Sequence, residues 1–212
     1  MIAVIDYEAG NAPSVVAALR HIGSDGQLVS SPEQLVTADK IILPGVGSAE
    51  ATLASLRSLN LIETLTGRVR AGVPFFGICV GLQVLFEHSE EGDVPCLGWF
   101  PGKVKRFANT TVRVPQIGWN SANLLRPHSI LEGLPNPSHF YFVNSYYVLP
   151  ENEELLLCDA HYGTRFGAMI ARDTVFATQF HVEKSGPLGL QILKNFLRVQ
   201  SNGKDPLAQS VV

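Results

Sequence analysis

The fold is decided by one stretch of the chain, Pro74-Phe75-Phe76-Gly77-Ile78-Cys79-Val80-Gly81. Its first five residues predict a short strand, because an apolar run without polar alternation is typical of a strand covered on both faces. The residues after Cys79 predict a helix that continues to about His88. A buried strand that passes directly into a helix is typical of a parallel βαβ unit.

The same alternation of strand and helix precedes this stretch. Ile2–Ile5 predicts a strand, and the helical pattern that follows it ends at Gly23. Lys40–Leu43 predicts a second strand, followed by helical periodicity over residues 53–69 with a break near Asn60. Strand, helix, strand, helix implies a parallel α/β sheet with helices on both faces.

The second half of the chain is less regular. Short β-prone runs separated by Pro and Gly extend from about Lys103 to Val148. Further strands are predicted at Leu155–Cys158, Phe166–Ile170 and Val175–Phe180. An amphipathic helix over residues 190–199 completes the predicted fold.

Length and charge limit the classes of protein that fit. A chain of 212 residues without a linker or repeat is expected to form one domain over residues 1–200 and a flexible tail over residues 201–212. The net charge of −3, from 16 basic and 19 acidic residues, argues against a nucleic-acid partner. No apolar run reaches the roughly 18 residues that a membrane span needs, so no membrane association is expected.

The first residues of the chain and its cysteine content bear on where in the cell the protein is expected. The opening residues MIAVIDYEAGN lack the basic segment of a signal peptide, so none is expected. Three cysteines, Cys79, Cys96 and Cys158, form no disulfide framework. A cytoplasmic location is therefore expected. Because the cysteines and histidines show no close ligand spacing, no metal site is expected.

A candidate nucleophile lies where the strand that ends at Ile78 meets the next helix. Gly77-Ile78-Cys79-Val80-Gly81 matches the G-x-nucleophile-x-G turn, with cysteine where many hydrolases carry serine. Glycines flank such a residue because the tight turn leaves no room for a nearby Cβ atom. The helix that follows is expected to favour the thiolate of Cys79. Taken alone, the pattern is equally compatible with a small buried cysteine that has no chemical role.

A thiol nucleophile needs a base, and His181 is the best placed of the six histidines. It follows the apolar run that ends at Phe180, at the expected carboxyl end of a strand, where catalytic groups of open α/β sheets gather. In extended backbone, residues two apart project to the same side, so Glu183 is expected to reach the imidazole and orient it. Without Cys79, the alternative is a solvated pair in a loop.

The segment Leu43-Pro44-Gly45-Val46-Gly47-Ser48 follows another predicted strand. A glycine-bracketed turn there exposes backbone N–H groups, which are the donors of an oxyanion hole. The N–H of Val80, next after the nucleophile, is the natural second donor. A simple strand terminator and a phosphate loop are the alternatives, although the ending of a P-loop is missing.

Taken together, these segments resemble one protein family. Gly77–Gln83 resembles the GICxGxQ nucleophile motif of class I glutamine amidotransferases, and Gln179–Ser185 resembles their QFHPEKS motif. Four more segments are similar to the branch of the family that supplies ammonia for histidine biosynthesis: Ile5–Asn11, Leu43–Gly47, Val114–Asn120 and Tyr141–Tyr147.

The resemblance implies a flavodoxin-like three-layer α/β/α sandwich, with a mostly parallel sheet and an additional antiparallel β region. It implies that Cys79, His181 and Glu183 form a triad that hydrolyses L-glutamine to glutamate and ammonia through a glutamyl thioester. The N–H groups of Val46 and Val80 would form the oxyanion hole. It also implies a partner, a (β/α)8-barrel cyclase that receives the ammonia through a channel, and no cofactor.

The resemblance assigns two further sets of residues. Positions that line the glutamine pocket are matched by Gly47, Gln83, Asn144, Ser145 and Tyr146. Positions that face the partner are matched by Asn11, Trp119, Tyr141 and Lys184. On residue type alone, the Trp is equally compatible with core filling, and sheet packing is the more common role for Tyr146.

Six positions depart from the family pattern, and none of them belongs to the expected triad: Glu8, Ala12, Pro13, Gln116, Asn144 and Val182. Two other functions stay open. One is a stand-alone cysteine hydrolase of γ-glutamyl compounds, and the other is a catalytically silent, amidotransferase-like binding subunit. We also expect the turn at Gly45–Gly47 to be a switch, with one N–H turned away from the oxyanion in the free subunit.

Overall fold

The computed structural model describes residues 1–8, 11–110 and 112–208. Its centre is a row of parallel strands in the order β2-β1-β3-β4-β13. The bounds of these strands are Ile2–Ile5 for β1, Gly26–Val29 for β2, Lys40–Leu43 for β3, Phe75–Ile78 for β4 and Val175–Thr178 for β13. Four of them, β1, β3, β4 and β13, lie where the sequence predicts a strand.

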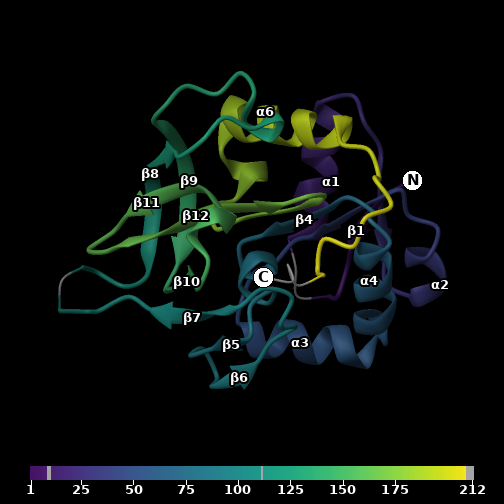
Figure 1. Ribbon diagram of the computed structural model, residues 1–212, viewed down its shortest axis with the longest axis horizontal. Helices are drawn as coiled ribbons and strands as arrows, with labels where there is room; N and C mark the ends of the chain where they lie inside the picture. Colours follow the sequence, from purple (N-terminus) through teal and green to yellow (C-terminus); the bar gives the residue numbers. More distant parts are fainter. Residues whose placement is uncertain (9–10, 111, 209–212) are drawn as a thin grey trace.

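Helices cover both faces of these strands, with α1 and α6 on one side and α3 and α4 on the other (Figure 1). The helices are α1 (Ala12–His21), α2 (Pro32–Leu35), α3 (Ala49–Ser58), α4 (Leu61–Arg70), α5 (Val80–Gln83) and α6 (Gly186–Arg198). The predicted break near Asn60 is confirmed, because this residue has a left-handed backbone between α3 and α4. The predicted α/β class is confirmed as well.

Beyond β13 the sheet is antiparallel, apart from the parallel pair β5 and β7, and continues to the left of Figure 1. These strands are β5 (His88–Ser89), β6 (Val94–Pro95), β7 (Gly102–Arg106), β8 (Gln116–Leu124), β9 (Ser138–Asn144), β10 (Tyr146–Pro150), β11 (Leu156–His161) and β12 (Arg165–Arg172). Short 3₁₀ turns are η1 (Ser129–Leu131), η2 (Glu153–Leu155) and η3 (Val182–Lys184). The described residues thus form one 13-stranded sheet with an antiparallel half.

Two sequence predictions about elements are wrong. The helix after Cys79 ends at Gln83 and does not reach His88, which instead begins β5. The carbonyls of residues 84–86 accept hydrogen bonds from the backbone N–H groups of residues 97–100, so the helix cannot continue through them. Strand β2 was not predicted at all, because its two central residues are exposed and the strand lies at the sheet edge.

The parallel pairing of β4 with β13 brings distant parts of the chain together. Ile78 is in register with Thr178 at the carboxyl ends of the two strands. Helix α6 packs against β4 through the rings of Phe196 and Phe76, whose centroids are 5.2 Å apart. The residues that follow the two strands therefore meet at one edge of the sheet.

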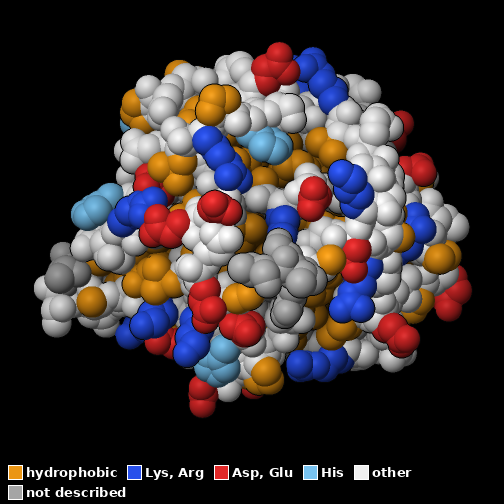
Figure 2. Space-filling view, viewed as in Figure 1, with side chains coloured by type: hydrophobic (Ala, Val, Ile, Leu, Met, Phe, Trp, Pro, Cys, Tyr) orange, Lys and Arg blue, Asp and Glu red, His pale blue; other side chains and the backbone are white. Residues whose placement is uncertain are grey.

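The predicted tail over residues 201–212 is only partly described. Pro206 is buried and Leu207 packs against the core, whereas residues 209–212 lie outside the described part of the chain. No helix among the described residues is long and apolar enough to cross a membrane. On the face drawn in Figure 2, basic and acidic side chains are intermixed and do not form a patch of one sign.

Candidate active site

Cys79 occupies the turn between β4 and α5. Its backbone has φ 55° and ψ −106°, a conformation that non-glycine residues rarely adopt. The backbone N–H donates to the carbonyl of Thr178 at 2.7 Å, which joins the turn to the end of β13. A strained turn held from a neighbouring strand directs the side chain away from the sheet, as the nucleophile motif predicts.

The two glycines that flank Cys79 are required by close backbone contacts. A Cβ atom at Gly81 would lie 2.1 Å from the carbonyl oxygen of Leu43, and one at Gly77 would lie 2.4 Å from the carbonyl oxygen of Gly81. Both distances are far below a van der Waals contact. The backbones of the turn and of β3 therefore pack against each other with no space for side chains.

His181 and Glu183 follow β13 and lie at the same edge of the sheet. The Nδ1 atom of His181 is 2.8 Å from Oε1 of Glu183, and both side chains are buried. The expectation of extended backbone between them is wrong, because η3 begins directly after His181. The backbone N–H of His181 donates to the carbonyl of Tyr141 at 3.0 Å and fixes the approach to this turn.

The imidazole of His181 also lies close enough to Cys79 to interact with it electrostatically. Burial disfavours the charged ring, but hydrogen bonds with Cys79 and Glu183 and the charges of both groups outweigh it and raise the pKa of His181 to about 10. Since Nδ1 is held by Glu183, Nε2 is the ring nitrogen left for the sulfur. The raised pKa favours His181 as the acceptor of the thiol proton.

Two further polar groups approach the sulfur of Cys79. The carbonyl oxygen of Val143 lies 3.7 Å from Sγ, and the side-chain Nε2 of Gln179 lies 3.6 Å from it. On the other side of the triad, Nδ2 of Asn11 donates to Oε1 of Glu183 at 2.6 Å. The second carboxylate oxygen, Oε2 of Glu183, is buried and has no hydrogen-bond partner among the residues that the structure describes.

The glycine-bracketed turn after β3 lies against α5 and against Tyr7. The Tyr7 hydroxyl donates to the carbonyl of Pro44 at 3.0 Å. Burial raises the pKa of the Tyr7 hydroxyl, and the backbone N–H of Val46, which faces this hydroxyl, opposes the rise. Val80 is the first residue of α5, where a backbone N–H has no partner within the helix. Of the two expected oxyanion donors, the N–H of Val46 thus faces Tyr7 in this structure.

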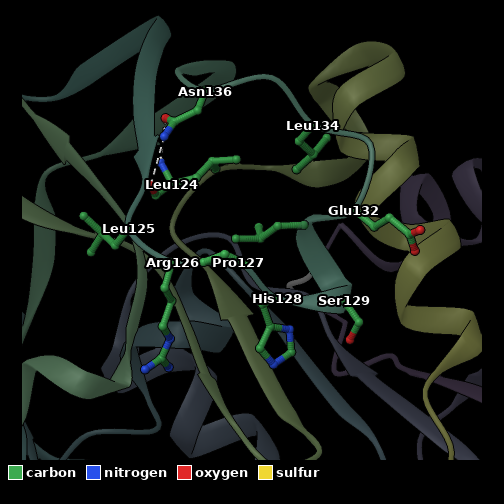
Figure 3. Close-up of a pocket in the computed structure, with 10 residues that line it drawn as sticks. Leu124, Leu125, Arg126, Pro127, His128, Ser129, Glu132, Leu134 and Asn136 are labelled. Atoms are coloured by element: carbon green, nitrogen blue, oxygen red, sulfur yellow. Dashed lines mark hydrogen bonds between the residues drawn. The ribbon is translucent and has the colours of Figure 1, made fainter.

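A pocket of about 240 Å³ opens beside the sulfur. Its lining residues are Gly47, Cys79, Val80, Gln83, Glu91, Pro115, Val143, Asn144, Ser145 and Tyr146. The five residues expected to line a glutamine pocket are all among them. A larger hollow of about 770 Å³ lies between the end of β8 and η1, where Asn136 hydrogen-bonds the backbone of Leu124 (Figure 3), and it contains none of the triad.

Comparison with known proteins agrees with this geometry. The family model for class I glutamine amidotransferases matches residues 3–199. The chain belongs to this family.

The amidotransferase is similar over nearly its whole length to curated proteins described as imidazole glycerol phosphate synthase subunit HisH. The relative from Chromobacterium violaceum is 43% identical over 210 residues, covering 95% of this chain and 99% of the relative. The relative from Chloroflexus aurantiacus is 44% identical over 202 residues, covering 93% and 95%. These similarities extend across both the parallel and the antiparallel parts of the sheet.

Solved structures agree on the fold. A crystal structure described as a glutamine amidotransferase superposes with a TM-score of 0.73 at 22% identity, covering 93% of this chain and 97% of that chain. PurLQS from Thermotoga maritima superposes with a TM-score of 0.75 at 16% identity, covering 92% and 96%. At such identities the match concerns the fold alone, and it confirms the predicted amidotransferase architecture.

Sequence reasoning missed Glu91, a carboxylate in the lining of the small pocket. Its Oε2 accepts the backbone N–H of Ala49 at 3.1 Å. Burial raises the pKa of the Glu91 carboxyl, and the hydrogen bond from Ala49 opposes this rise. No signal in the sequence distinguishes it, because the pair Glu90-Glu91 has the composition of an ordinary solvated turn.

The residues expected to face a partner lie next to the triad. Trp119 on β8 is 59% exposed, so it does not fill the core, and its ring meets that of Tyr141 on β9 edge to face at 6.1 Å. Asn11 touches Glu183 directly, and the exposed Lys184 comes next in the chain. Among the described residues, no cluster of three or more His, Cys, Asp or Glu side chains is arranged to hold a metal.

Proposed function

We propose that this chain is the glutaminase subunit of an imidazole glycerol phosphate synthase. It hydrolyses L-glutamine to glutamate and ammonia and passes the ammonia to a cyclase subunit in histidine biosynthesis. The proposed location of the protein is the cytoplasm. The observation that carries the proposal is the contact of Cys79, His181 and Glu183 beside a small polar pocket. The similarity to subunits of that synthase over nearly the whole chain identifies the pathway.

The proposed reaction begins with attack of the Cys79 sulfur on the side-chain amide carbon of glutamine. His181 takes the thiol proton and later delivers a proton to the departing ammonia, which leaves a glutamyl thioester. Water then attacks the thioester, and His181 removes its proton while the sulfur leaves. Glu183 holds the ring orientation and stabilises the imidazolium.

The pocket lining supports binding of a free amino acid. Gln83, Asn144, Ser145 and Tyr146 surround the pocket with amides, hydroxyls and backbone groups. The α-ammonium group of glutamine needs an anionic partner, and Glu91 is the carboxylate in the pocket. We assign the α-ammonium to Glu91 for this reason.

The turn at Gly45–Gly47 is proposed to be the switch of activity. The oxyanion of the tetrahedral intermediate needs the N–H groups of Val46 and Val80, but that of Val46 faces the hydroxyl of Tyr7. Absence of one oxyanion donor costs about 2.7–4 kcal/mol of transition-state stabilisation. The free subunit is therefore about a hundredfold or more slower until the partner rotates this peptide.

The partner is proposed to be a (β/α)8-barrel cyclase that docks on the face formed by Asn11, Trp119, Tyr141 and Lys184. The exposed, edge-to-face pair of Trp119 and Tyr141 offers the large aromatic area that anchors protein interfaces. Asn11 hydrogen-bonds Glu183 of the triad. A partner that contacts Asn11 would therefore act on a residue that is bonded to the triad.

The decisive experiment measures glutamate release by the intact chain alone, with the cyclase, and with the cyclase plus its ligand. The proposal predicts slow turnover alone, strong activation by the loaded cyclase, and loss of turnover in Cys79→Ser. Full turnover without any effect of the cyclase would instead support a stand-alone hydrolase of γ-glutamyl compounds. Binding to the cyclase without turnover under any condition would support a silent binding subunit.

A further inference from the structure

Gln179 is a completely buried amide that touches the candidate nucleophile. It follows β13, and its backbone N–H donates to the carbonyl of Ala168 at 2.9 Å. Its side chain turns toward the strand end of β4, where Nε2 lies 3.6 Å from the sulfur of Cys79. This contact of Cys79 is different from its interaction with His181, and Gln179 is not one of the three triad residues.

The orientation of the Gln179 amide follows from its neighbours. Nε2 of Gln83 lies 3.1 Å from the backbone carbonyl of Tyr146 and 3.1 Å from Oε1 of Gln179. A backbone carbonyl can only accept, so Gln83 must present its NH₂ group to both oxygens. The oxygen of Gln179 therefore faces Gln83, and its NH₂ group faces the sulfur.

The groups around the sulfur have opposite effects on its ionisation. The carbonyl of Val143 accepts the S–H and favours the thiol, whereas an amide N–H favours the thiolate. Two titratable groups, Tyr7 and His181, interact electrostatically with Cys79, and Glu91 lines the same pocket. Gln179 is thus a neutral donor whose contribution does not depend on its own titration.

We propose that the side-chain amide of Gln179 stabilises the negative charge on the Cys79 sulfur and is a further catalytic residue of this site. When the thiol proton moves to His181, the N–H of Gln179 already points at the anion, so no reorganisation is needed. The amide keeps its own protons throughout. If the proposed glutaminase reaction holds, the same donor stabilises the thiolate that leaves when the thioester is hydrolysed.

The test is the pH dependence of Cys79 alkylation by iodoacetamide in the full-length chain, compared with Gln179→Met. Methionine has a similar length but no N–H donor. Removing a hydrogen bond to a charged group is expected to raise the thiol pKa by about one to two units and to slow alkylation at least about tenfold on the acid side. Burial raises the pKa of Cys96 to about 11 and that of Cys158 to about 12, so neither obscures the measurement below pH 9.

Thr178→Val is the matched control. The Thr178 hydroxyl donates to the carbonyl of Phe180 at 2.8 Å, so the variant also loses a buried hydrogen bond next to the site but does not touch the sulfur. Its Cys79 profile is expected to match that of the parent chain. An unchanged profile in a folded Gln179→Met variant, or an equal shift in Thr178→Val, would overturn the proposal.

A measurement on the unaltered chain covers the case in which Gln179→Met does not fold. The side-chain amide resonances of Gln179, followed by NMR in glutamine-labelled protein, are expected to shift with the same midpoint as the alkylation. If the chemical shifts of this amide did not change when Cys79 ionises, the proposed hydrogen bond to the sulfur would be wrong. Both readouts concern the thiol itself, whereas failure of the proposed function would appear separately as undiminished glutamine hydrolysis by Cys79→Ser.

Discussion

The hydroxyl of Tyr7 donates a hydrogen bond of 3.0 Å to the carbonyl of Pro44, at the end of β3. The N–H of Val46, two residues later, faces the same hydroxyl, and the hydroxyl oxygen of Thr52 on α3 lies 3.5 Å from it. One buried side chain thus contacts two successive peptide units, Pro44–Gly45 and Gly45–Val46, and the second of these would have to rotate to complete an oxyanion hole.

Tyr7→Phe is therefore expected to raise the glutaminase rate of the free chain. The variant loses hydrogen bonds that hold the turn in its present orientation, each with a net contribution of about 0.5–1.5 kcal/mol. This corresponds to an increase of about 2–10-fold in kcat without the partner, and to a smaller activation when the partner is added. Steady-state rates with and without the cyclase measure both quantities.

Tyr162→Phe provides the comparison for this variant. Its hydroxyl donates to the carbonyl of Arg113 at 2.6 Å, away from the turn, so the free-chain rate should stay at the parent value. A Tyr7→Phe chain that is folded but no faster than the parent would show that the hydroxyl does not restrain the turn.

Much of the site could be predicted from the sequence because its reactive residues directly follow predicted strands. Cys79 and His181 each follow an apolar run, and parallel strands carry their carboxyl ends to one edge. The sequence does not show that β4 and β13 are neighbours, which depends on long-range pairing. The resemblance to a family supplied this adjacency, not the periodicity.

The elements that could not be predicted lack a local signal. Strand β2 exposes both of its central side chains at the sheet edge, so it shows neither a buried run nor alternation. The helix after Cys79 keeps an apolar pattern beyond Gln83, but tertiary hydrogen bonds to residues 97–100 replace the helical ones. In both cases the structure is determined by hydrogen bonds to a segment of the chain that is distant in the sequence.

Gly81→Ala is expected to destabilise the chain and abolish turnover. The added methyl group would lie 2.1 Å from the backbone carbonyl oxygen of Leu43, and neither backbone segment can move away without disturbing the packing of the turn against β3. We expect a loss of about 1–3 kcal/mol in the free energy of unfolding, measured by urea titration. Gly67→Ala is the counterpart within α4, where nothing lies within 4 Å, and it should stabilise the chain by about 0.5–1 kcal/mol. Equal effects of the two variants would refute the steric explanation.

The raised pKa of His181 predicts a pH-dependent contribution to stability. The folded value of about 10 exceeds the ordinary 6.5, so the contribution is fully present below about pH 6.5 and is lost as the pH rises toward 10. The stability difference between the parent and His181→Asn should therefore shrink over this window, by at most about 1.4 kcal/mol per pH unit. Urea titrations at several pH values measure it.

Glu183→Gln tests the cause of that shift. It removes one of the groups that raise the pKa of His181, so the upper limit of the window should move to lower pH. A stability difference that stays constant between pH 6.5 and 10 would mean that the imidazole is not charged in the folded chain.

Glu91→Gln is expected to weaken glutamine binding more than it slows the chemical step. The amide can still accept the N–H of Ala49, as Oε2 of Glu91 does at 3.1 Å, but it cannot neutralise an α-ammonium group. Loss of a partly buried charge pair should raise KM by about tenfold or more and change kcat by less than about twofold. Initial rates over a range of glutamine concentrations separate the two.

The pH dependence of KM gives a second check on Glu91. Burial raises the pKa of its carboxyl, so KM in the parent should increase as the pH falls through that value, and Glu91→Gln should lose this dependence. Glu90→Gln is the matched neighbour, since Glu90 is exposed and accepts the backbone N–H of Arg106 at 2.9 Å outside the pocket. Its kinetics should equal those of the parent. If both variants raised KM alike, the effect would come from general surface charge and Glu91 would not be the ammonium site.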